Sequence, residues 1–229
     1  MTRIVRVAVI DSGVHAPHPH VAGVSGGIGI DEHGDTHDDY VDRLGHGTAV
    51  SAAIREKAPD AEIFAIKVFW QALATDIRSL TRAIEVAAER DAHLINLSLG
   101  TAEMEHRPRL EEVLASCRRS GSIVVAAHDD NGMRWLPGSL DEVVGVKADW
   151  TCDRQGYRVS SVNGRWLLTT SPYPRDIPGV PRERNLSGIS FAVANATGFA
   201  ARALEAAPGS DLARVFETLH EAACTIPSA

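Results

Sequence analysis

Cysteine is scarce in this sequence, which has only Cys117, Cys152 and Cys224 among its 229 residues. An odd number of cysteines at wide spacing predicts reduced packing residues and argues against a disulfide framework or a cysteine-bound metal. Basic residues are also outnumbered, because 23 lysines and arginines face 30 acidic residues and leave a net charge of −7. No basic cluster interleaves with aromatic residues, so we expect no nucleic-acid partner.

A long hydrophobic run is missing as well. The apolar stretch from Ile4 to Ile10 is too short for a membrane span or a signal-peptide core, and it runs directly into Asp11. We therefore expect no membrane partner, no signal peptide or pro-domain ahead of the first strand, and a cytoplasmic location. The length fits one α/β domain that covers residues 1–229.

Apolar strand patterns alternate with amphipathic helix patterns along the chain. The predicted strands cover residues 7–11, 61–69, 94–99, 123–127 and 143–146. The predicted helices cover residues 47–56, 77–87 and 107–119, and an Ala-rich helix begins near residue 190. This alternation predicts an α/β fold with a mostly parallel central sheet, helices on both faces, and functional groups at the carboxyl ends of the strands.

Ser190 lies where an irregular, proline-rich run gives way to the Ala-rich helix. The first turn of a helix has free backbone N–H groups and the positive end of the helix dipole, which favour developing negative charge. A nucleophilic hydroxyl suits this position. On composition alone, the simpler interpretation is that Ser187 or Ser190 is an ordinary N-cap.

Two other stretches favour catalysis over capping. The apolar run from Val7 ends at Asp11, and a Gly-His-Gly-Thr stretch places His46 at the start of another Ala-rich helix. Asp, His and Ser in this order, each at the edge of a regular element, is one of the orders that a Ser-His-Asp triad takes. The carboxylate can orient the imidazole, and the imidazole can deprotonate the hydroxyl.

Four motifs carry a family resemblance: Asp11-Ser-Gly, Gly45-His-Gly-Thr, Asn96-Leu-Ser-Leu-Gly and Ser187-Gly-Ile-Ser-Phe-Ala. On these motifs the chain resembles the subtilisin-like serine proteases, or subtilases, from Val7 to about Leu204. The resemblance implies a three-layer subtilisin-like fold and a peptide or protein substrate, with no cofactor. It also implies that Ser190 attacks the substrate, that His46 takes and later returns the proton, and that Asp11 holds the imidazole.

The segment after the predicted strand 123–127 departs from the subtilase pattern. In that family an Asn side chain from an Ala-Gly-Asn segment usually helps the backbone N–H of the nucleophile to bind the oxyanion. An ungapped match places Asp130 at the Asn position, and a one-residue slip places Asn131 there. An ionised Asp130 would repel the oxyanion, whereas a protonated one could donate a hydrogen bond. Loss of one such donor costs about 10²–10³ in kcat.

The resemblance also implies substrate-binding residues. Ser98, Leu99 and Gly100 match the strand edge on which subtilases pair an extended substrate backbone. The alternative for them is an ordinary strand-to-loop turn. Trp135 matches a small residue on the floor of the specificity pocket, which would restrict the P1 side chain to a small one. The alternative is that Trp135 packs elsewhere, because the loop lengths differ.

Residues 15–44 are rich in histidine and acidic residues, which could ligate a metal. No compact pair of ligands on a predicted helix organises them, so we favour a solvated loop whose acidity would suit basic substrates. Only Lys57-Ala-Pro-Asp separates the helix after His46 from the next strand, where many secreted subtilases insert a calcium-binding loop. We therefore expect no metal site and no dependence on calcium.

These observations predict a serine endopeptidase of restricted specificity. Ile189, Phe191 and Ala194 stand where subtilases commonly have Thr, Met and Pro, which favours a processing role over bulk digestion. The oxyanion substitution keeps open a second class, a pseudoprotease that binds extended peptides without cutting them. A third class is a peptide transacylase or cyclase that releases the acyl-enzyme to an amine, and nothing in the sequence separates it from hydrolysis.

Overall fold

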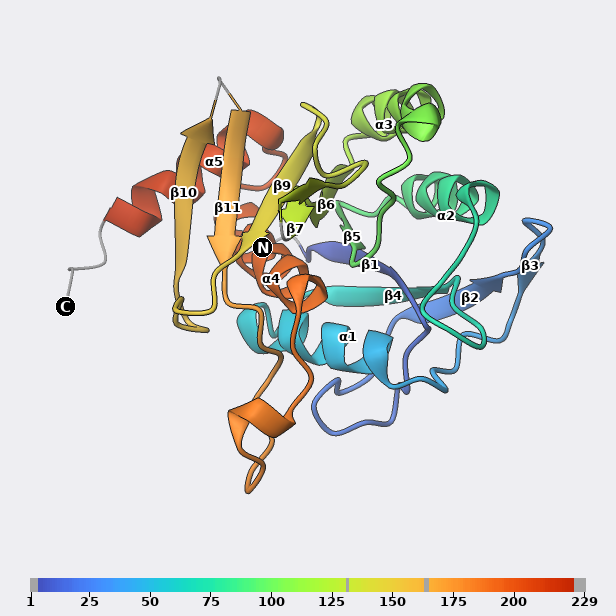
Figure 1. The fold of residues 1–229 in the computed structure, drawn as a ribbon, viewed down its shortest axis with the longest axis horizontal. Coiled ribbons are helices and arrows are strands. Elements are labelled where there is room, and N and C mark those ends of the chain that lie inside the picture. The colour runs from blue at the N-terminus through green and yellow to red at the C-terminus, as the bar shows by residue number, and fades with distance from the viewer. Residues whose placement is uncertain (1–3, 131, 163–164, 225–229) are drawn as a thin grey trace.

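The computed structural model describes residues 4–130, 132–162 and 165–224, with a nine-stranded sheet at its centre (Figure 1). The strands of this sheet, in chain order, are β1 (Arg6–Asp11), β2 (Gly26–Ile30), β3 (Thr36–His37), β4 (Glu62–Lys67), β5 (Leu94–Leu97), β6 (Ile123–Ala127), β9 (Val143–Ala148), β10 (Tyr157–Val162) and β11 (Arg165–Thr170). The helices are α1 (His46–Lys57), α2 (Ile77–Glu89), α3 (Arg107–Ser120), α4 (Ile189–Ala206) and α5 (Leu212–Cys224). A small separate hairpin joins β7 (Asp129–Asp130) to β8 (Met133–Arg134).

The sheet is mostly parallel, as predicted. Its order is β10-β11-β9-β6-β5-β1-β4-β2-β3, and every pair from β11 to β2 runs parallel. Within the described part of this nine-stranded sheet, only the edge strands β10 and β3 are antiparallel to their neighbours. Parallel strands need crossover connections, and the helices between them supply these.

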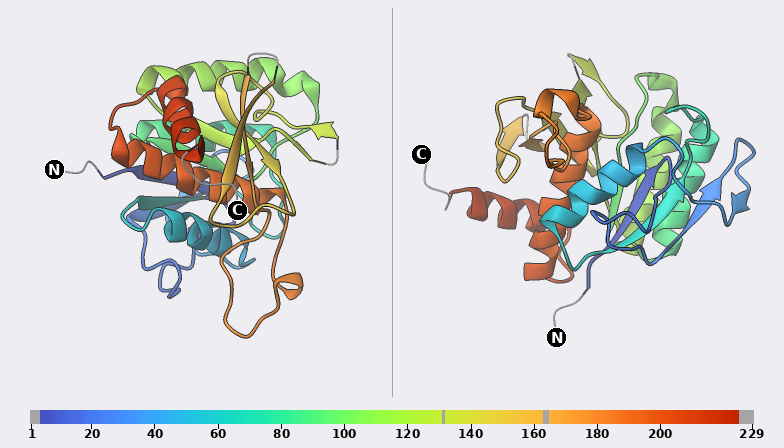
Figure 2. Two further views of the ribbon diagram at one scale, coloured as in Figure 1. Left: turned by 90° about the vertical axis from the view of Figure 1, so that its left-hand side faces the viewer. Right: turned by 90° about the horizontal axis from the view of Figure 1, so that it is seen from below.

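Helices cover both faces of the sheet and complete three layers (Figures 1 and 2). Alternate residues of β1 show why, because successive side chains of a strand point to opposite faces. Val7 and Val9 pack in the core that α1, α4 and α5 cover. Ala8 and Ile10 pack in the core that α2 and α3 cover. The predicted α/β fold of the subtilisin type is therefore confirmed.

The elements that the sequence analysis left out lie mainly at the edges of the sheet. β2 shows the physical reason, because its glycines carry no strand propensity. A Cβ on Gly27 would lie 2.5 Å from the ring of Tyr40 and 2.8 Å from the carbonyl oxygen of Ala65. A glycine is needed there so that the following loop can pack closely on the strand, which hides the strand from a pattern of apolar residues.

The carboxyl ends of the central strands gather the predicted functional residues. Asp11 is the last residue of β1, and His46 is the first residue of α1. Ser98 follows β5 directly, and Ser190 lies in the first turn of α4. Hydrogen bonds join the members of each pair, so both pairs lie at this edge. This is the edge at which α/β folds generally bind ligands.

Two further expectations concern the cysteines and the membrane. Cys117 and Cys152 are buried and free, while the side chain of Cys224 lies outside the described residues. Across the part of the chain that the structure describes, no helix is both long enough and apolar enough to cross a membrane.

Candidate active site

Asp11 and His46 form the most completely built part of the site. The Asp11 side chain is fully buried, and its two carboxylate oxygens lie 2.8 and 3.0 Å from Nδ1 of His46. A carboxylate on Nδ1 fixes the orientation of the ring and its tautomer. Nε2 is then the ring nitrogen left to exchange a proton. The sequence placed these two residues 35 positions apart, and the fold brings them into contact.

Glycine allows this contact to form. A Cβ on Gly47 would lie 2.2 Å from the carbonyl oxygen of Gly13 and 3.1 Å from Oδ1 of Asp11. Only a residue without a side chain therefore lets the first turn of α1 approach the end of β1. Gly45 precedes the helix with φ 83°, a left-handed conformation that other residues adopt at a cost. The lack of space at position 47 and the left-handed backbone at position 45 explain why a glycine stands on each side of His46.

Asp42 is a residue of this site that the sequence analysis did not single out. Its carboxylate accepts hydrogen bonds from Ser12 Oγ at 2.8 Å, from Thr48 Oγ1 at 2.6 Å and from the backbone N–H of Gly45 at 2.8 Å. It thereby joins the loop after β1 to the start of α1. An acidic residue shortly before a helix start was the available signal, since the free N–H groups of a first turn need acceptors.

The charges around His46 alter its proton affinity. Burial disfavours the charged imidazole, but the hydrogen bond that His46 donates to Asp11 and the negative charges of Asp11 and Asp42 outweigh burial and raise the pKa of His46 above 6.5. Burial likewise opposes ionisation of Asp42, but its hydrogen bonds from Thr48, Gly45 and Ser12 lower the pKa of Asp42. Asp42 therefore stays ionised and favours the imidazolium form of His46.

Ser190 lies inside the first turn of α4 and is not its N-cap. Gly188 is the N-cap, and neither Ser187 nor Ser190 makes a side-chain capping hydrogen bond. The simpler interpretation of these serines is therefore wrong. Ser190 Oγ instead donates a hydrogen bond of 3.2 Å to the carbonyl oxygen of Ser98. The hydroxyl is thus free of helix capping and lies against the residue that follows β5.

A buried polar network holds α4 against β5 beneath Ser190. Thr197 Oγ1 donates to Oδ1 of Asn96 at 2.8 Å, and Nδ2 of Asn96 donates to Ser98 Oγ at 2.9 Å. Ser98 Oγ then donates to the carbonyl oxygen of Ser190 at 3.2 Å. Asn96 and Thr197 are fully buried, so their hydrogen bonds are shielded from water. Asn96 begins one of the family motifs, but the motif alone predicted no role for its side chain.

His46 and Ser190 line one cavity of about 230 Å³. The predicted substrate-binding residues Ser98, Leu99, Gly100 and Trp135 line it too. Its other walls are apolar or small side chains that the sequence analysis did not assign to substrate binding: Phe69, Leu73, Ala127, Ile189 and Val193. A Cβ on Gly100 would lie 3.5 Å from the indole of Trp135, so the indole packs beside that strand edge.

The two oxyanion candidates are placed differently. Asp130 is half-buried in β7 and pairs with Met133 of β8. Among the described residues, it is not one of those that line the cavity of His46 and Ser190. Asn131 lies outside the described residues. The choice between Asp130 and Asn131 therefore stays a prediction.

The histidine-rich loop forms ion pairs and hydrogen bonds within the protein. His37 contacts Asp31 at 2.9 Å and lowers the pKa of Asp31 to about 2. Within residues 4–130, 132–162 and 165–224, one set of three potential ligands is grouped closely enough for a metal, namely Glu103, Glu105 and His106 on the surface. Both carboxylates are exposed, and no further observation points to an ion there.

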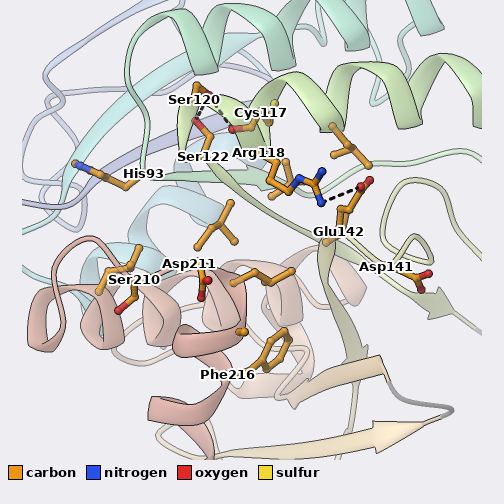
Figure 3. Close-up of a pocket in the computed structure, with 18 of the residues that line it drawn as sticks. His93, Cys117, Arg118, Ser120, Ser122, Asp141, Glu142, Ser210, Asp211 and Phe216 are labelled. Atoms are coloured by element: carbon orange, nitrogen blue, oxygen red, sulfur yellow. Dashed lines mark hydrogen bonds and ion pairs between the residues drawn. The ribbon is translucent and has the colours of Figure 1, made fainter.

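A larger cavity, of about 830 Å³, lies at the amino ends of the strands, opposite the ends that carry His46 and Ser190 (Figure 3). It is formed by the starts of β6 and β9 and by α3 and α5. Its potential nucleophiles are not activated. Burial raises the pKa of Cys117 to about 11, and Ser120 and Ser122 donate to backbone carbonyl oxygens. The chemistry therefore favours the edge that carries His46 and Ser190.

Known proteins that are similar to this chain include proteases. The chain is 29% identical over 210 residues to the thermostable alkaline protease of Halalkalibacterium halodurans, in an alignment that covers 86% of this chain and 55% of that protein. The chain thus spans about half the length of this curated relative. A cold-adapted subtilisin-like serine proteinase has a similar fold, with a TM-score of 0.73, 18% identity, and coverage of 95% of this chain and 81% of the other.

A second solved structure is also similar. The prenylagaramide maturation protease PagA aligns with a TM-score of 0.63 and 26% identity, over 87% of this chain and 74% of that one. The subtilase family itself matches residues 2–225, nearly the whole sequence. With the parallel sheet and the motifs at its carboxyl edge, this match shows that the chain belongs to the subtilase family.

Proposed function

We propose that this chain is a serine endopeptidase that cleaves its substrate through an acyl-enzyme on Ser190. The observation that carries the proposal is the shared cavity of Ser190 and His46, in which His46 is already bonded to the buried carboxylate of Asp11. A nucleophile, a base and a group that orients the base are the three parts that such chemistry needs.

The reaction begins with Ser190. Its hydroxyl leaves the carbonyl oxygen of Ser98 and turns about χ1, which moves Oγ between staggered positions at low cost. His46 removes the hydroxyl proton as Oγ attacks the scissile carbonyl carbon, and then gives that proton to the leaving amine. A water molecule repeats the sequence on the acyl-enzyme and releases the acid. Asp11 stabilises the imidazolium that forms in each half of the reaction.

The backbone N–H of Ser190 is our first oxyanion donor. It lies in the first turn of α4, where N–H groups have no acceptor inside the helix and the helix dipole favours negative charge. Asp130 or Asn131 is our second candidate. An ionised carboxylate at this position opposes the oxyanion, so a slow reaction is the expectation if Asp130 occupies it.

We assign the acyl side of the substrate to Ser98, Leu99 and Gly100, which offer backbone groups to an extended peptide. Trp135 occupies space beside Gly100 in the same cavity, so the P1 residue is small. Narrow specificity of this kind suits a processing enzyme. The similarity to the maturation protease PagA supports the same conclusion.

Two observations favour a second function. Ser190 Oγ donates to Ser98 and not to His46, and an ungapped match places Asp130 where subtilases usually have an oxyanion-binding amide. Both features are compatible with a protein that binds extended peptides along Ser98 to Gly100 without cleaving them. The complete pairing of Asp11 with His46 argues for the enzyme.

The test is cleavage of peptides that carry one small residue at P1 within a fixed sequence. We expect two fragments whose masses sum to that of the substrate plus one water, and we expect no cleavage by Ser190→Ala. Binding without cleavage at any enzyme concentration would support the peptide-binding function. A cyclic or amine-capped product would support the transacylase.

A further inference from the structure

A third cavity, of about 580 Å³, lies between the loop after β1 and the proline-rich loop before α4. Its floor is the side of α1 that carries Ala49 and Ala52. Ile177 and Leu186 line it from the proline-rich loop and are 44% and 50% exposed. Exposed apolar side chains around a concave floor are typical of a binding site. We call this cavity the loop pocket.

Hydrogen bonds fix the wall of the loop pocket that the proline-rich loop provides. The loop leaves the fold below α4 in Figure 1. Nδ2 of the buried Asn195 donates to the carbonyl oxygens of Ser171 and Tyr173 at 2.9 and 3.0 Å, which holds the base of the loop. Farther out, Nδ2 of Asn185 donates to the carbonyl oxygen of Arg175 at 3.1 Å and closes the loop across its own width. A wall held in this way binds with little loss of conformational entropy.

The two arginines at this pocket have no anionic partner among the residues that the structure describes. Arg175 and Arg184 line it, and neither side chain makes an ion pair with any described residue. His15, His18 and His20 line the opposite wall. The pKa of His20 is lowered, first by burial and then by the charges of Arg175 and His18, while the charge of Glu56 opposes this shift.

Three acidic residues of the neighbouring loop are already engaged within the protein. Asp31 is bonded to His37, and Asp39 is bonded to Arg43 at 2.8 Å. Asp42 is the one acidic residue among those that line the loop pocket, and its carboxylate is occupied by hydrogen bonds from Ser12 and Thr48. The pocket therefore presents unpaired positive charge in a chain whose net charge is −7. An acidic ligand complements it, and a basic one does not.

The position of the loop pocket relates it to the proposed reaction. Gly45, which lines it, directly precedes His46, and Leu186 lies four residues before Ser190. The proposed acyl-side groove lies elsewhere, because Leu99 and Gly100 line two neighbouring cavities that share no lining residue with the loop pocket. The loop pocket therefore adjoins the residues next to His46 and before Ser190 and is separate from the groove of Ser98 to Gly100, which leaves it open to the leaving-group side of a substrate.

We infer that the loop pocket binds the part of the substrate that follows the scissile bond, and that it selects an apolar residue next to acidic residues. This inference rests on the proposed function. The apolar side chain packs between Ile177, Leu186 and the surface of α1, and the acidic residues pair with Arg175 and Arg184. Specificity then has two sources. The acyl-side groove limits the size of the P1 residue, and the loop pocket selects the charge of the residues that follow the scissile bond.

The experiment measures binding, so that it does not depend on turnover. The protein is Ser190→Ala, and the probe is the peptide Ala-Leu-Glu-Glu-Gly-Gly with a free amino group and a fluorophore at its carboxyl end. A second peptide has Lys for both Glu residues, and a third has Ser for Leu. We expect the Glu peptide to bind about tenfold more tightly than the Lys peptide, because two exposed ion pairs replace two repulsions. We expect the Ser peptide to bind more weakly than the Leu peptide.

Added to Ser190→Ala, the double change Arg175→Gln and Arg184→Gln should remove the preference for the Glu peptide. The matched control is Arg109→Gln with Arg119→Gln, two exposed arginines of α3, and it should keep the preference. The preference should also weaken in high salt. Equal affinity for the Glu and Lys peptides, or a preference that survives in the Arg175 and Arg184 variant, would overturn the inference. Labelling of the unmodified protein by a fluorophosphonate tests the nucleophile separately, so either idea can fail alone.

Discussion

The two sides of the proposed cleavage site are built to different degrees. On one side, Asp11 and His46 are in contact, and Asp42 supports them through hydrogen bonds from Ser12 and Thr48. On the other side, Ser190 Oγ donates to the carbonyl oxygen of Ser98 rather than to the imidazole of His46. The proposed base is therefore oriented before substrate binds, whereas the proposed nucleophile has to turn toward it.

This difference shows where the two sides obtain their geometry. The position of His46 is fixed by backbone packing, since Gly47 has no room for a Cβ between Gly13 and Asp11. The backbone of Ser190 is held by a polar network through Ser98 and Asn96, while its hydroxyl makes one hydrogen bond, to the carbonyl oxygen of Ser98. Steric contacts fix the position of the proposed base His46. The Ser190 hydroxyl has to turn from Ser98 toward His46 when substrate binds.

The largest effect should come from removing either member of the proposed pair. Ser190→Ala and His46→Ala should each lower kcat by about 10⁴–10⁶, and the double variant should lose no more than the worse single one, because the two residues act as a unit. Turnover of a peptide substrate measures this, with thermal unfolding as the check on folding. Additive losses in the double variant would contradict a shared mechanism.

Gly47→Ala should disrupt the contact between His46 and Asp11. The new Cβ would meet the carbonyl oxygen of Gly13 at 2.2 Å, so the start of α1 has to move and carry His46 away from Asp11. We expect a loss of about 100-fold in kcat, because small misplacements of reacting groups have effects of this size. Stability should fall by about 2–4 kcal/mol.

The matched control for this change is Gly156→Ala. A Cβ on Gly156 would meet only atoms 3.8 and 4.0 Å away, and that glycine lies far from α1 in the sequence. Its kcat and melting temperature should stay close to those of the unmodified protein. If Gly47→Ala also leaves both unchanged, steric packing does not set the position of His46.

Asp130→Asn should strengthen oxyanion binding beside Ser190. An amide at the oxyanion can donate a hydrogen bond where a carboxylate repels, so we expect kcat to rise by about tenfold or more. The control is Asp129→Asn, the neighbouring residue in β7, whose carboxylate lies 3.2 Å from Nζ of Lys147 and should not affect kcat. An unchanged rate in both variants would place Asp130 away from the oxyanion.

Trp135→Gly should change which substrates are cut. Removal of the indole opens the cavity beside Gly100, so kcat/KM for a large apolar P1 residue should rise by about 10–100-fold relative to a small one. A set of peptides that differ only at P1 measures the ratio. The ratio would stay constant if Trp135 packs away from the substrate.

Asp42→Asn should give the smallest effect, which concerns pH. The pKa of His46 is raised, so kcat/KM should fall as the pH drops through a value above 6.5 and the imidazole becomes protonated. Removal of the Asp42 charge lowers that pKa and should move the acid limb of the profile to lower pH. Asp38→Asn, an exposed residue of the same loop, should leave the profile in place. A shift in neither variant would show that Asp42 acts only by hydrogen bonding.

The sequence predicted the parallel sheet and the meeting of Asp11 with His46, because apolar strands and helix starts are local patterns with known consequences at a sheet edge. It could not predict that Asp42 would join Ser12 to Thr48, since that contact depends on how a 30-residue loop folds back. The loop pocket was hidden for the same reason. Its charge comes from two loops more than 150 residues apart, and the sequence of the first loop alone suggested acidity.

The most direct test of the central claim is labelling by a fluorophosphonate, followed by mass spectrometry of the intact protein and of its fragments. The account predicts a single adduct on Ser190 that forms faster above the pKa of His46 and disappears in Ser190→Ala. Folded protein that takes no label at any pH from about 5 to 9, the range over which a histidine titrates, would contradict it. The cleft would then be a site that holds peptides without cutting them.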